Sequence, residues 1–383
     1  MSVARKYFIN AGLLLGSLLV SFLFLEALLR FGFPEKNVLF PRYHSEAHYG
    51  DFTIRRLEPD AEFRHTSIDG SWDFVTNNKG FRNHNNTHYK KRNGVIRVLV
   101  LGDSHTEGFE VRQESTYSFI LEKYLTRRGY DVEVINAGVS GFSTAEELVF
   151  LENEGIKYDP DYVVAGFFAN DYDDNIKSDL FRYRAGKLKI NKKVYIPGVR
   201  ILAWHNKFGI LRWLSERSYL YSFAMNLGWD FFKNSLLQEK SSEMSVFSGS
   251  LDRYKLDLAG QLVRRMCQFG RKSAIVTIMI DIPRLSSHAG ERYQSSVEPE
   301  TERTMRENCD AFIGSDAYLE RFSGVIDPFV PHGHRHISEF THTLIGVYLG
   351  SKIEAFESQK LKNIKVIQND KNEAQDPAGS GYM

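Results

Sequence analysis

The chain after residue 95 alternates short apolar runs with segments of helical periodicity. Apolar runs of this length, rich in β-branched residues, are typical of strands buried on both faces of a sheet. Such runs occupy residues 96–101, 132–136, 162–168, 274–280 and, more briefly, 324–327. Strands that alternate with helices predict a parallel sheet covered by helices on both faces. We therefore expect an α/β domain over residues 95–357.

Helical patterns fill the gaps between these runs. Ser143 and Glu146 form a capping-box pattern that predicts the start of a helix. The other predicted helices carry apolar residues at helical spacing, and they occupy residues 115–128, 256–269 and 340–356.

A long insertion interrupts this alternation at residues 176–250. It is rich in aromatic and basic residues, among them Trp204, Trp213, Trp229 and Arg212. The favoured interpretation is a small helical subdomain with its own core, because aromatic stripes usually pack inside. The alternatives are a cap over the site that binds sugars or acyl chains, and a segment that lies on a membrane surface.

The N-terminal residues 1–33 contain an apolar run at residues 7–29, preceded by Arg5 and Lys6. Its length of about 23 residues suits one membrane span. A signal peptide usually has a shorter apolar core and a cleavage site of small residues, which this run lacks. We expect an uncleaved anchor with a cytoplasmic N-terminus, and an i, i+4 pair between Glu26 and Arg30 at its end.

The remaining segments carry less information. The composition of residues 34–94 predicts a polar N-terminal extension with a few strands or turns, and that of residues 358–383 predicts a disordered tail. Cys267 and Cys309 are the only cysteines in the sequence, and their spacing fits either one disulfide or two buried thiols. The net charge of +1 gives no strong field for nucleic acid, so none is expected as a partner.

Four polar segments follow the predicted strands, and because parallel strands end at one edge of a sheet, we expect these segments to lie close together. They carry Ser104, Gly138, Asn170 and His336. A serine needs a base to become a nucleophile, and His336, just before the last helix, can supply it. The backbone amides of Ser104 and Gly138 and the side-chain amide of Asn170 can stabilise an oxyanion. His332 and His334 alternate with His336 as metal ligands on a strand do, but no cysteine or acidic ligand lies close by in sequence, so no metal is expected.

The segments around Ser104, Gly138, Asn170 and His336 resemble the signature blocks of the SGNH, or GDSL-type, hydrolase superfamily. The resemblance covers residues 76–357 and implies a three-layer α/β/α, flavodoxin-like fold. It also implies acyl ester chemistry without a metal or other cofactor. The anchor and the block at residues 78–82 resemble membrane-tethered bacterial members, several of which act on acylated polysaccharides.

The last block departs from the family pattern. The family usually has an aspartate two or three residues before the histidine, where this chain has Gly333 and His334. Asp327, at the end of the predicted fifth strand, is a candidate substitute for orienting the His336 imidazole. A Ser–His dyad oriented by a backbone carbonyl is the alternative.

The sequence thus predicts a serine esterase, anchored in a bacterial inner membrane, with its catalytic domain in the periplasm. Ser104 is the expected nucleophile and His336 the base, and the substrate is an acylated small molecule or glycan with an acetyl group. An O-acetyltransferase that acylates a polysaccharide remains the close alternative, since the same acyl-enzyme can react with a sugar hydroxyl. A non-catalytic glycan-binding or scaffold protein is the alternative from another class.

Overall fold

The structure is a computed structural model of the 383-residue chain. It describes residues 3–36, 38–39, 41–248, 250–287, 291–332 and 336–374.

A five-stranded parallel sheet lies at the centre of the main domain. Its strand order is β14-β11-β7-β5-β6. The strands are β5 (Ile96–Leu101), β6 (Val132–Asn136), β7 (Tyr162–Phe167), β11 (Val276–Asp281) and β14 (Ala311–Ile313). In chain order this is the 2-1-3-4-5 arrangement of flavodoxin-like sheets. The predicted fold class is therefore confirmed.

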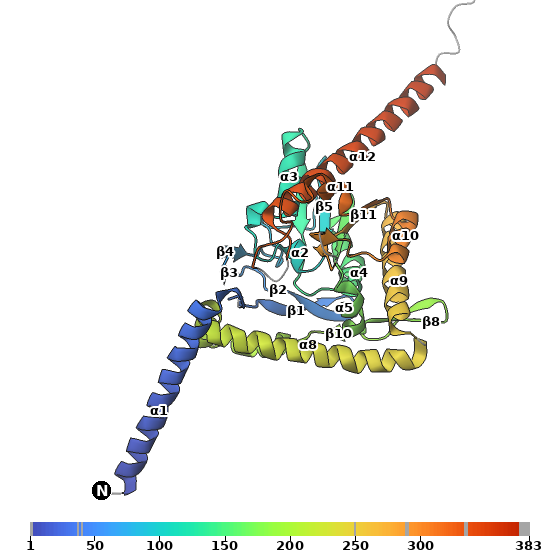
Figure 1. Cartoon of the computed structure of the whole chain (residues 1–383). Coiled ribbons are helices and arrows are strands. Elements are labelled where there is room, and N and C mark those ends of the chain that lie inside the picture. Colours follow the sequence, from blue (N-terminus) through green and yellow to red (C-terminus); the bar gives the residue numbers. More distant parts are fainter. Residues whose placement is uncertain are drawn as a thin grey trace, which may run out of the picture.

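Helices cover both faces of this sheet, so the domain has three layers (Figure 1). Along β5, Val98 and Val100 face one helical layer, while Leu99 and Leu101 face the other. The first layer contains α3 (Tyr117–Arg127) and α12 (Glu339–Ala374). The second contains α4 (Thr144–Asn153), α5 (Asp171–Ser178), α9 (Leu251–Lys272) and α10 (Pro299–Asn308).

The strand predicted at residues 324–327 was wrong. Residues 324–327 form a turn, and the fifth strand is β14, which pairs with β11. The predicted tail at residues 358–383 begins inside α12, whose backbone stays helical to Ala374. The remainder of that tail, residues 375–383, lies outside the described residues.

The N-terminal extension forms two antiparallel hairpins beside the main domain. They are β1 (His44–Tyr49) with β2 (Phe52–Leu57), and β3 (Glu62–Ser67) with β4 (Gly70–Val75). The short strand β10 (Val194–Tyr195) joins β2 in parallel. The extension therefore packs into the domain, and Ile54 and Phe74 belong to the same core as the second helical layer.

The insertion contributes one hairpin and three helices. The hairpin pairs β8 (Phe181–Arg184) with β9 (Lys187–Ile190), and the helices are α6 (Val199–His205), α7 (Gly209–Arg217) and α8 (Tyr219–Ser248). Its aromatic residues do not build a core of their own: the exposed fractions of Trp204, Trp213 and Phe231 are 58%, 49% and 76%. Short elements elsewhere are β12 (Arg284–Leu285), β13 (Tyr293–Gln294), α2 (Ser104–Glu107) and α11 (Asp316–Leu319).

Helix α1 (Val3–Ala27) projects away from the domain (Figure 1). Residues 4–32 form a 29-residue apolar helical stretch, and no residue in its most apolar part is buried. By length and composition this helix is able to cross a membrane. The predicted pair at its end is present, with the Arg30 guanidinium 2.8 Å from the Glu26 carboxylate.

A disulfide joins Cys267 on α9 to Cys309, the residue after α10. Their Cα atoms lie 5.0 Å apart, within the normal range for a disulfide. The bond links two neighbouring helices of the second layer. Of the two alternatives that the cysteine spacing left open, one disulfide or two buried thiols, the structure has the disulfide.

Candidate active site

Ser104 and His336 meet at the carboxyl edge of the central sheet. The Nε2 atom of His336 lies 2.8 Å from the Ser104 hydroxyl oxygen. Both residues line a cleft of about 360 Å³, and Asn170 lines it as well. A base at hydrogen-bond distance from a serine hydroxyl is the geometry that nucleophilic catalysis requires.

The turn after β5 presents Ser104 at the start of the short helix α2. Asp103 caps this helix by accepting a hydrogen bond from the His105 amide at 2.9 Å. Gly102 has a φ of +153°, and a Cβ at this position would come within 1.9 Å of the Thr106 hydroxyl. Only glycine therefore allows β5 to turn directly into α2.

The block after β6 is fixed against α2 by the Asn136 side chain. Its amide group donates to the Thr106 carbonyl and to the Ser118 hydroxyl, each at 3.0 Å. Its carbonyl oxygen accepts from the Gly138 amide at 3.1 Å. Gly138 is also packed so closely that a Cβ would lie 2.4 Å from the Glu107 amide nitrogen. The structure thus brings Gly138 beside α2. Its amide, which was predicted as an oxyanion donor, already donates its hydrogen to the Asn136 side chain.

Asn170 follows β7 and enters the cleft at the start of α5. Its Nδ2 donates to the Asp103 carboxylate at 3.1 Å. An amide nitrogen carries two hydrogens, so a second one remains for a ligand. In the described part of the chain, no hydrogen bond uses the Ser104 amide. The two donors that the geometry offers are therefore the Ser104 amide and the Asn170 side chain.

Sequence reasoning missed Glu110. Its carboxylate Oε2 lies 3.7 Å from the Nδ1 atom of His336, on the ring nitrogen that Ser104 does not contact. Glu110 is 1% exposed and has a left-handed φ of +60°. Within the described residues, no backbone carbonyl accepts a hydrogen bond from this Nδ1. The only signal in the sequence is an acidic residue six positions after the serine, which is too weak to single it out.

Arg82 holds the loop that carries Glu110. Its buried guanidinium donates to the carbonyls of Glu107, Gly108 and Val111, at 2.9 Å for Glu107 and 2.7 Å for Val111. These carbonyls lie on both sides of Glu110 in the chain. The block at residues 78–82, which the sequence singled out, therefore contributes to the site by fixing this loop.

Asp327, which was predicted to orient the imidazole, does not do so. Its carboxylate accepts from the Phe329 amide at 3.1 Å, and no ion pair joins it to His336 within the described residues. Residues 324–327 form a turn and not the strand that was expected to carry Asp327 to the site. His332 pairs instead with Asp69 at 2.9 Å, and His334 lies outside the described residues.

Burial changes the charge of the groups around the site. It raises the pKa of Asp103 to about 6, although hydrogen bonds from the His105 amide and Asn170 oppose the rise. It lowers the pKa of His105 well below the usual value, so this ring is neutral where it packs 4.8 Å from His336. Phe109 stacks on the His336 ring at 4.5 Å. The imidazole is thus held between two uncharged rings.

The insertion forms one wall of the cleft. Helix α8 contributes Trp229, Lys233 and Leu236, and β10 contributes Tyr195. Four cationic side chains line the cleft beside two carboxylates, namely Arg42, Arg55, Lys177 and Lys233 with Asp174 and Asp230. Of the alternatives open from the sequence, a cap over the site fits this arrangement, since residues of α8 line the same cleft as the serine and the histidine.

Comparison with known proteins identifies relatives of this region. Residues 98–196 match the family model described as GDSL-like Lipase/Acylhydrolase. An arylesterase of Vibrio mimicus is 36% identical over 75 residues, which cover 20% of this chain and 38% of that protein. The chain therefore spans well under half the length of this curated relative.

Two bacterial proteins are among the solved structures that this chain matches. A lipolytic protein of the G-D-S-L family from Desulfitobacterium hafniense is 10% identical, and the match covers 67% of this chain and 98% of that one with a TM-score of 0.38. The lipase/acylhydrolase of Enterococcus faecalis is 14% identical, covering 68% and 96% with a TM-score of 0.39.

Proposed function

We propose that this chain, which carries a GDSL-like lipase/acylhydrolase segment at residues 98–196, is a serine esterase that hydrolyses acyl esters through Ser104. The observation that carries the proposal is the 2.8 Å contact between His336 Nε2 and the Ser104 hydroxyl oxygen. This contact lies in an open cleft at the carboxyl edge of a parallel sheet, where ligands of such folds bind.

In the proposed first step, His336 takes the Ser104 hydroxyl proton while the oxygen attacks the ester carbonyl carbon. The tetrahedral oxyanion accepts hydrogen bonds from the Ser104 amide and from the free hydrogen of Asn170 Nδ2. The intermediate then collapses, and the imidazolium donates its proton to the departing alcohol. A water molecule, deprotonated by His336, then attacks the acyl-serine carbonyl. The second tetrahedral intermediate collapses, the imidazolium returns its proton to the Ser104 oxygen, and the carboxylic acid leaves.

Glu110 is the proposed positioning acid of this site. A carboxylate beside Nδ1 favours the tautomer that has its proton on Nδ1 and leaves Nε2 free to accept from Ser104. It also stabilises the imidazolium that forms during the reaction. At 3.7 Å the Glu110 carboxylate makes an electrostatic contact, and a shift of under 1 Å would turn it into a hydrogen bond. We propose Ser104, His336 and Glu110 as the working triad.

The proposed substrate is an acetyl ester on an envelope or exported glycan. Tyr195 and Trp229 give the cleft aromatic surfaces, and its charged groups are suited to a polar ligand. The resemblance to membrane-tethered members also supports this class. Transfer of the acetyl group to a sugar hydroxyl instead of water is the alternative outcome of the same acyl-enzyme.

We also propose that α1 anchors the chain in a bacterial inner membrane, with the catalytic domain in the periplasm. Arg5 and Lys6 precede the apolar stretch, which favours a cytoplasmic N-terminus. The disulfide between Cys267 and Cys309 belongs to an oxidising compartment. Recovery of the protein in alkali-resistant membranes supports the anchor, whereas a soluble mature chain that starts beyond α1 contradicts it.

The function is tested with 4-nitrophenyl acetate and an acetylated oligosaccharide as substrates, each with and without an unacetylated oligosaccharide acceptor. We expect release of acetate by the wild-type protein and none above background by Ser104→Ala. Transfer of acetyl to the acceptor in preference to water identifies the transferase. Equal inactivity of wild type and Ser104→Ala on both substrates contradicts an enzymatic role.

A further inference from the structure

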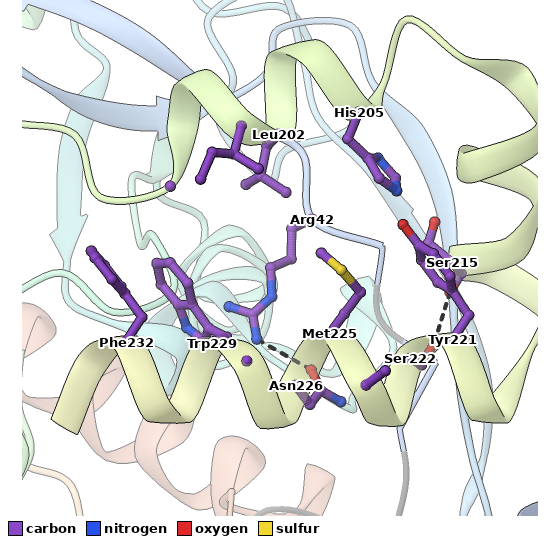
Figure 2. A pocket seen from close by; sticks show the side chains of 14 residues that line it. Arg42, Leu202, His205, Ser215, Tyr221, Ser222, Met225, Asn226, Trp229 and Phe232 are labelled. Atoms are coloured by element: carbon purple, nitrogen blue, oxygen red, sulfur yellow. Dashed lines mark hydrogen bonds between the residues drawn. The ribbon is translucent and has the colours of Figure 1, made fainter. Parts of the chain in front are cut away.

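A second hollow adjoins the cleft, between helices α6 and α8. We call it the α6–α8 pocket. It has a volume of about 270 Å³ and an apolar lining that includes Ile201, Leu202, Met225 and Trp229. Figure 2 shows Leu202 from α6 and Met225 from α8 on opposite sides of this space. Apolar walls with a few polar groups are typical of sites for small organic ligands.

The α6–α8 pocket and the cleft share part of their lining. Arg42, Asn226, Trp229 and Phe232 belong to both. A ligand that occupies the pocket thus extends toward the cleft that holds Ser104. The pocket is partly open to solvent, and Ile201, one of its lining residues, is 67% exposed.

Arg42 places a positive charge where the two hollows join. Its guanidinium donates to the Asn226 side chain at 3.4 Å and lies 5.1 Å above the Trp229 ring (Figure 2). Burial lowers the pKa of Arg42 only to about 10, so it stays protonated at neutral pH. Within the described residues, no carboxylate forms an ion pair with it. An arginine in this setting suits a carboxylate or a phosphate.

The wall of this pocket is fixed to the end of the apolar N-terminal helix. The Glu26 carboxylate accepts from the amides of Tyr219 and Leu220, at 3.0 and 2.9 Å, and so caps the start of α8. Arg30 donates to the Arg217 carbonyl at 2.6 Å. Figure 1 shows α8 starting beside the end of α1 and running along the edge of the molecule. The pocket therefore lies near the level at which a membrane-spanning α1 leaves the bilayer.

The exposed face of α8 supports this placement. Phe223, Leu227 and Phe231 follow each other at i, i+4 spacing, and their exposed fractions are 38%, 62% and 76%. Spacing of this kind puts the three side chains on one side of the helix. An exposed apolar stripe on a helix, close to a membrane anchor, is typical of segments that lie in the headgroup region.

We propose that the α6–α8 pocket binds the hydrocarbon chain of an anionic lipid, with the anionic head group at Arg42. The chain enters from the membrane side and lies between Leu202 and Met225. This inference goes beyond ester hydrolysis, because the binding requires neither Ser104 nor His336. It assigns the insertion a role as a lipid-binding element beside the cleft.

The test uses the full chain in phosphatidylcholine nanodiscs and palmitate that carries a photoreactive diazirine near the end of its chain. We expect crosslinks on Leu202, Met225 and their neighbours in the pocket, located by peptide mass spectrometry. Met225→Trp fills the pocket and should lower the yield by about 10-fold, as expected when a ligand loses its apolar contacts. Leu227→Trp, on the same helix but outside the pocket, is the matched control and should keep the wild-type yield.

Two further arms separate the head group from the chain. Arg42→Gln should weaken labelling by the palmitate probe but not by the corresponding neutral alcohol, and competition by phosphatidylglycerol vesicles shows that a membrane lipid can occupy the site. Leu202→Trp repeats the filling from the facing helix, and thermal melting shows which variants are folded. Equal yields for folded Met225→Trp and Leu227→Trp, or labels confined to α1, overturn the proposal. These readouts measure lipid binding and do not depend on esterase activity. A failure of the lipid-binding proposal can therefore be distinguished from a failure of the proposed esterase function.

Discussion

The carboxylate of Glu110 lies 3.7 Å from the Nδ1 atom of His336, while Ser104 lies 2.8 Å from Nε2 of the same ring. The proposed acid, base and nucleophile therefore lie along one imidazole ring. The proposed acid comes from the loop after α2, only six residues beyond the serine, and not from the segment before the histidine. Arg82, which binds three carbonyls of that loop, links the N-terminal extension to this arrangement.

Replacing Glu110 by glutamine should reduce kcat and leave KM nearly unchanged. The loss expected from removing the acid of such a triad is about 10²- to 10⁴-fold. Asp327→Asn is the matched control and should retain wild-type activity. Equal effects of the two variants on kcat contradict the assignment.

Asn170→Ala should lower kcat by about 10²- to 10³-fold, the typical effect of losing one oxyanion donor. Steady-state kinetics on 4-nitrophenyl acetate measure this loss. Asn308→Ala, at the end of α10 and outside the cleft, controls for the change of residue type. If Asn170→Ala keeps its kcat and only KM rises, Asn170 binds the substrate without stabilising the transition state.

Glu107 makes stability depend on pH. Burial raises its pKa to about 7, although hydrogen bonds from Ser140 lower it. The folded protein therefore keeps this proton to a higher pH than the unfolded chain, and the contribution of Glu107 to stability falls as the pH rises from about 4.5 to about 7. Because glutamine does not titrate, Glu107→Gln should not lose this contribution to stability as the pH rises. Its unfolding free energy relative to wild type should rise across this range by up to about 3 kcal/mol.

Urea unfolding of both proteins at several pH values measures this difference. Glu62→Gln, an exposed carboxylate on β3, controls for the change in net charge. A difference between Glu107→Gln and wild type that stays constant across the range contradicts the raised pKa of this buried carboxyl group.

The disulfide should stabilise the second helical layer. Cys267 and Cys309 are separated by 42 residues, and closing a loop of this size contributes about 2–4 kcal/mol. The double variant Cys267→Ala/Cys309→Ala should therefore melt at a lower temperature. Thiol titration of the denatured, unreduced protein should find no free thiol. Two titratable thiols in protein from the periplasm contradict the bond.

The strands near the site could be predicted closely from the sequence. The apolar runs at residues 96–101 and 132–136 became β5 and β6 without change, because strands buried on both faces need continuous apolar residues. The fifth strand, Ala311–Ile313, was missed because three residues are too few to form a recognisable pattern. The turn at residues 324–327 looked like a strand only because Val325 and Ile326 are adjacent in the sequence.

The contacts of the site were harder to predict. The approach of Ser104 and Asn170 follows from parallel strands that end at one edge, whereas the strand expected before His336 is absent, so the place of His336 depends on loop packing. Glu110 could not be found, since its approach to His336 depends on a loop conformation with a left-handed residue and on the buried Arg82. The role of α8 as a wall of the cleft also depends on packing, because a stripe of aromatic residues fits a core and a cap equally well.

The central claim is that Ser104 is a nucleophile activated by His336. Labelling of the purified full chain with a fluorophosphonate probe tests it most directly, because the probe reacts only with an activated serine. The account predicts that wild-type protein is labelled on Ser104, that Ser104→Ala is not labelled, and that His336→Ala reacts far more slowly. Equal absence of label on folded wild type and Ser104→Ala, or equal labelling of both, would contradict it.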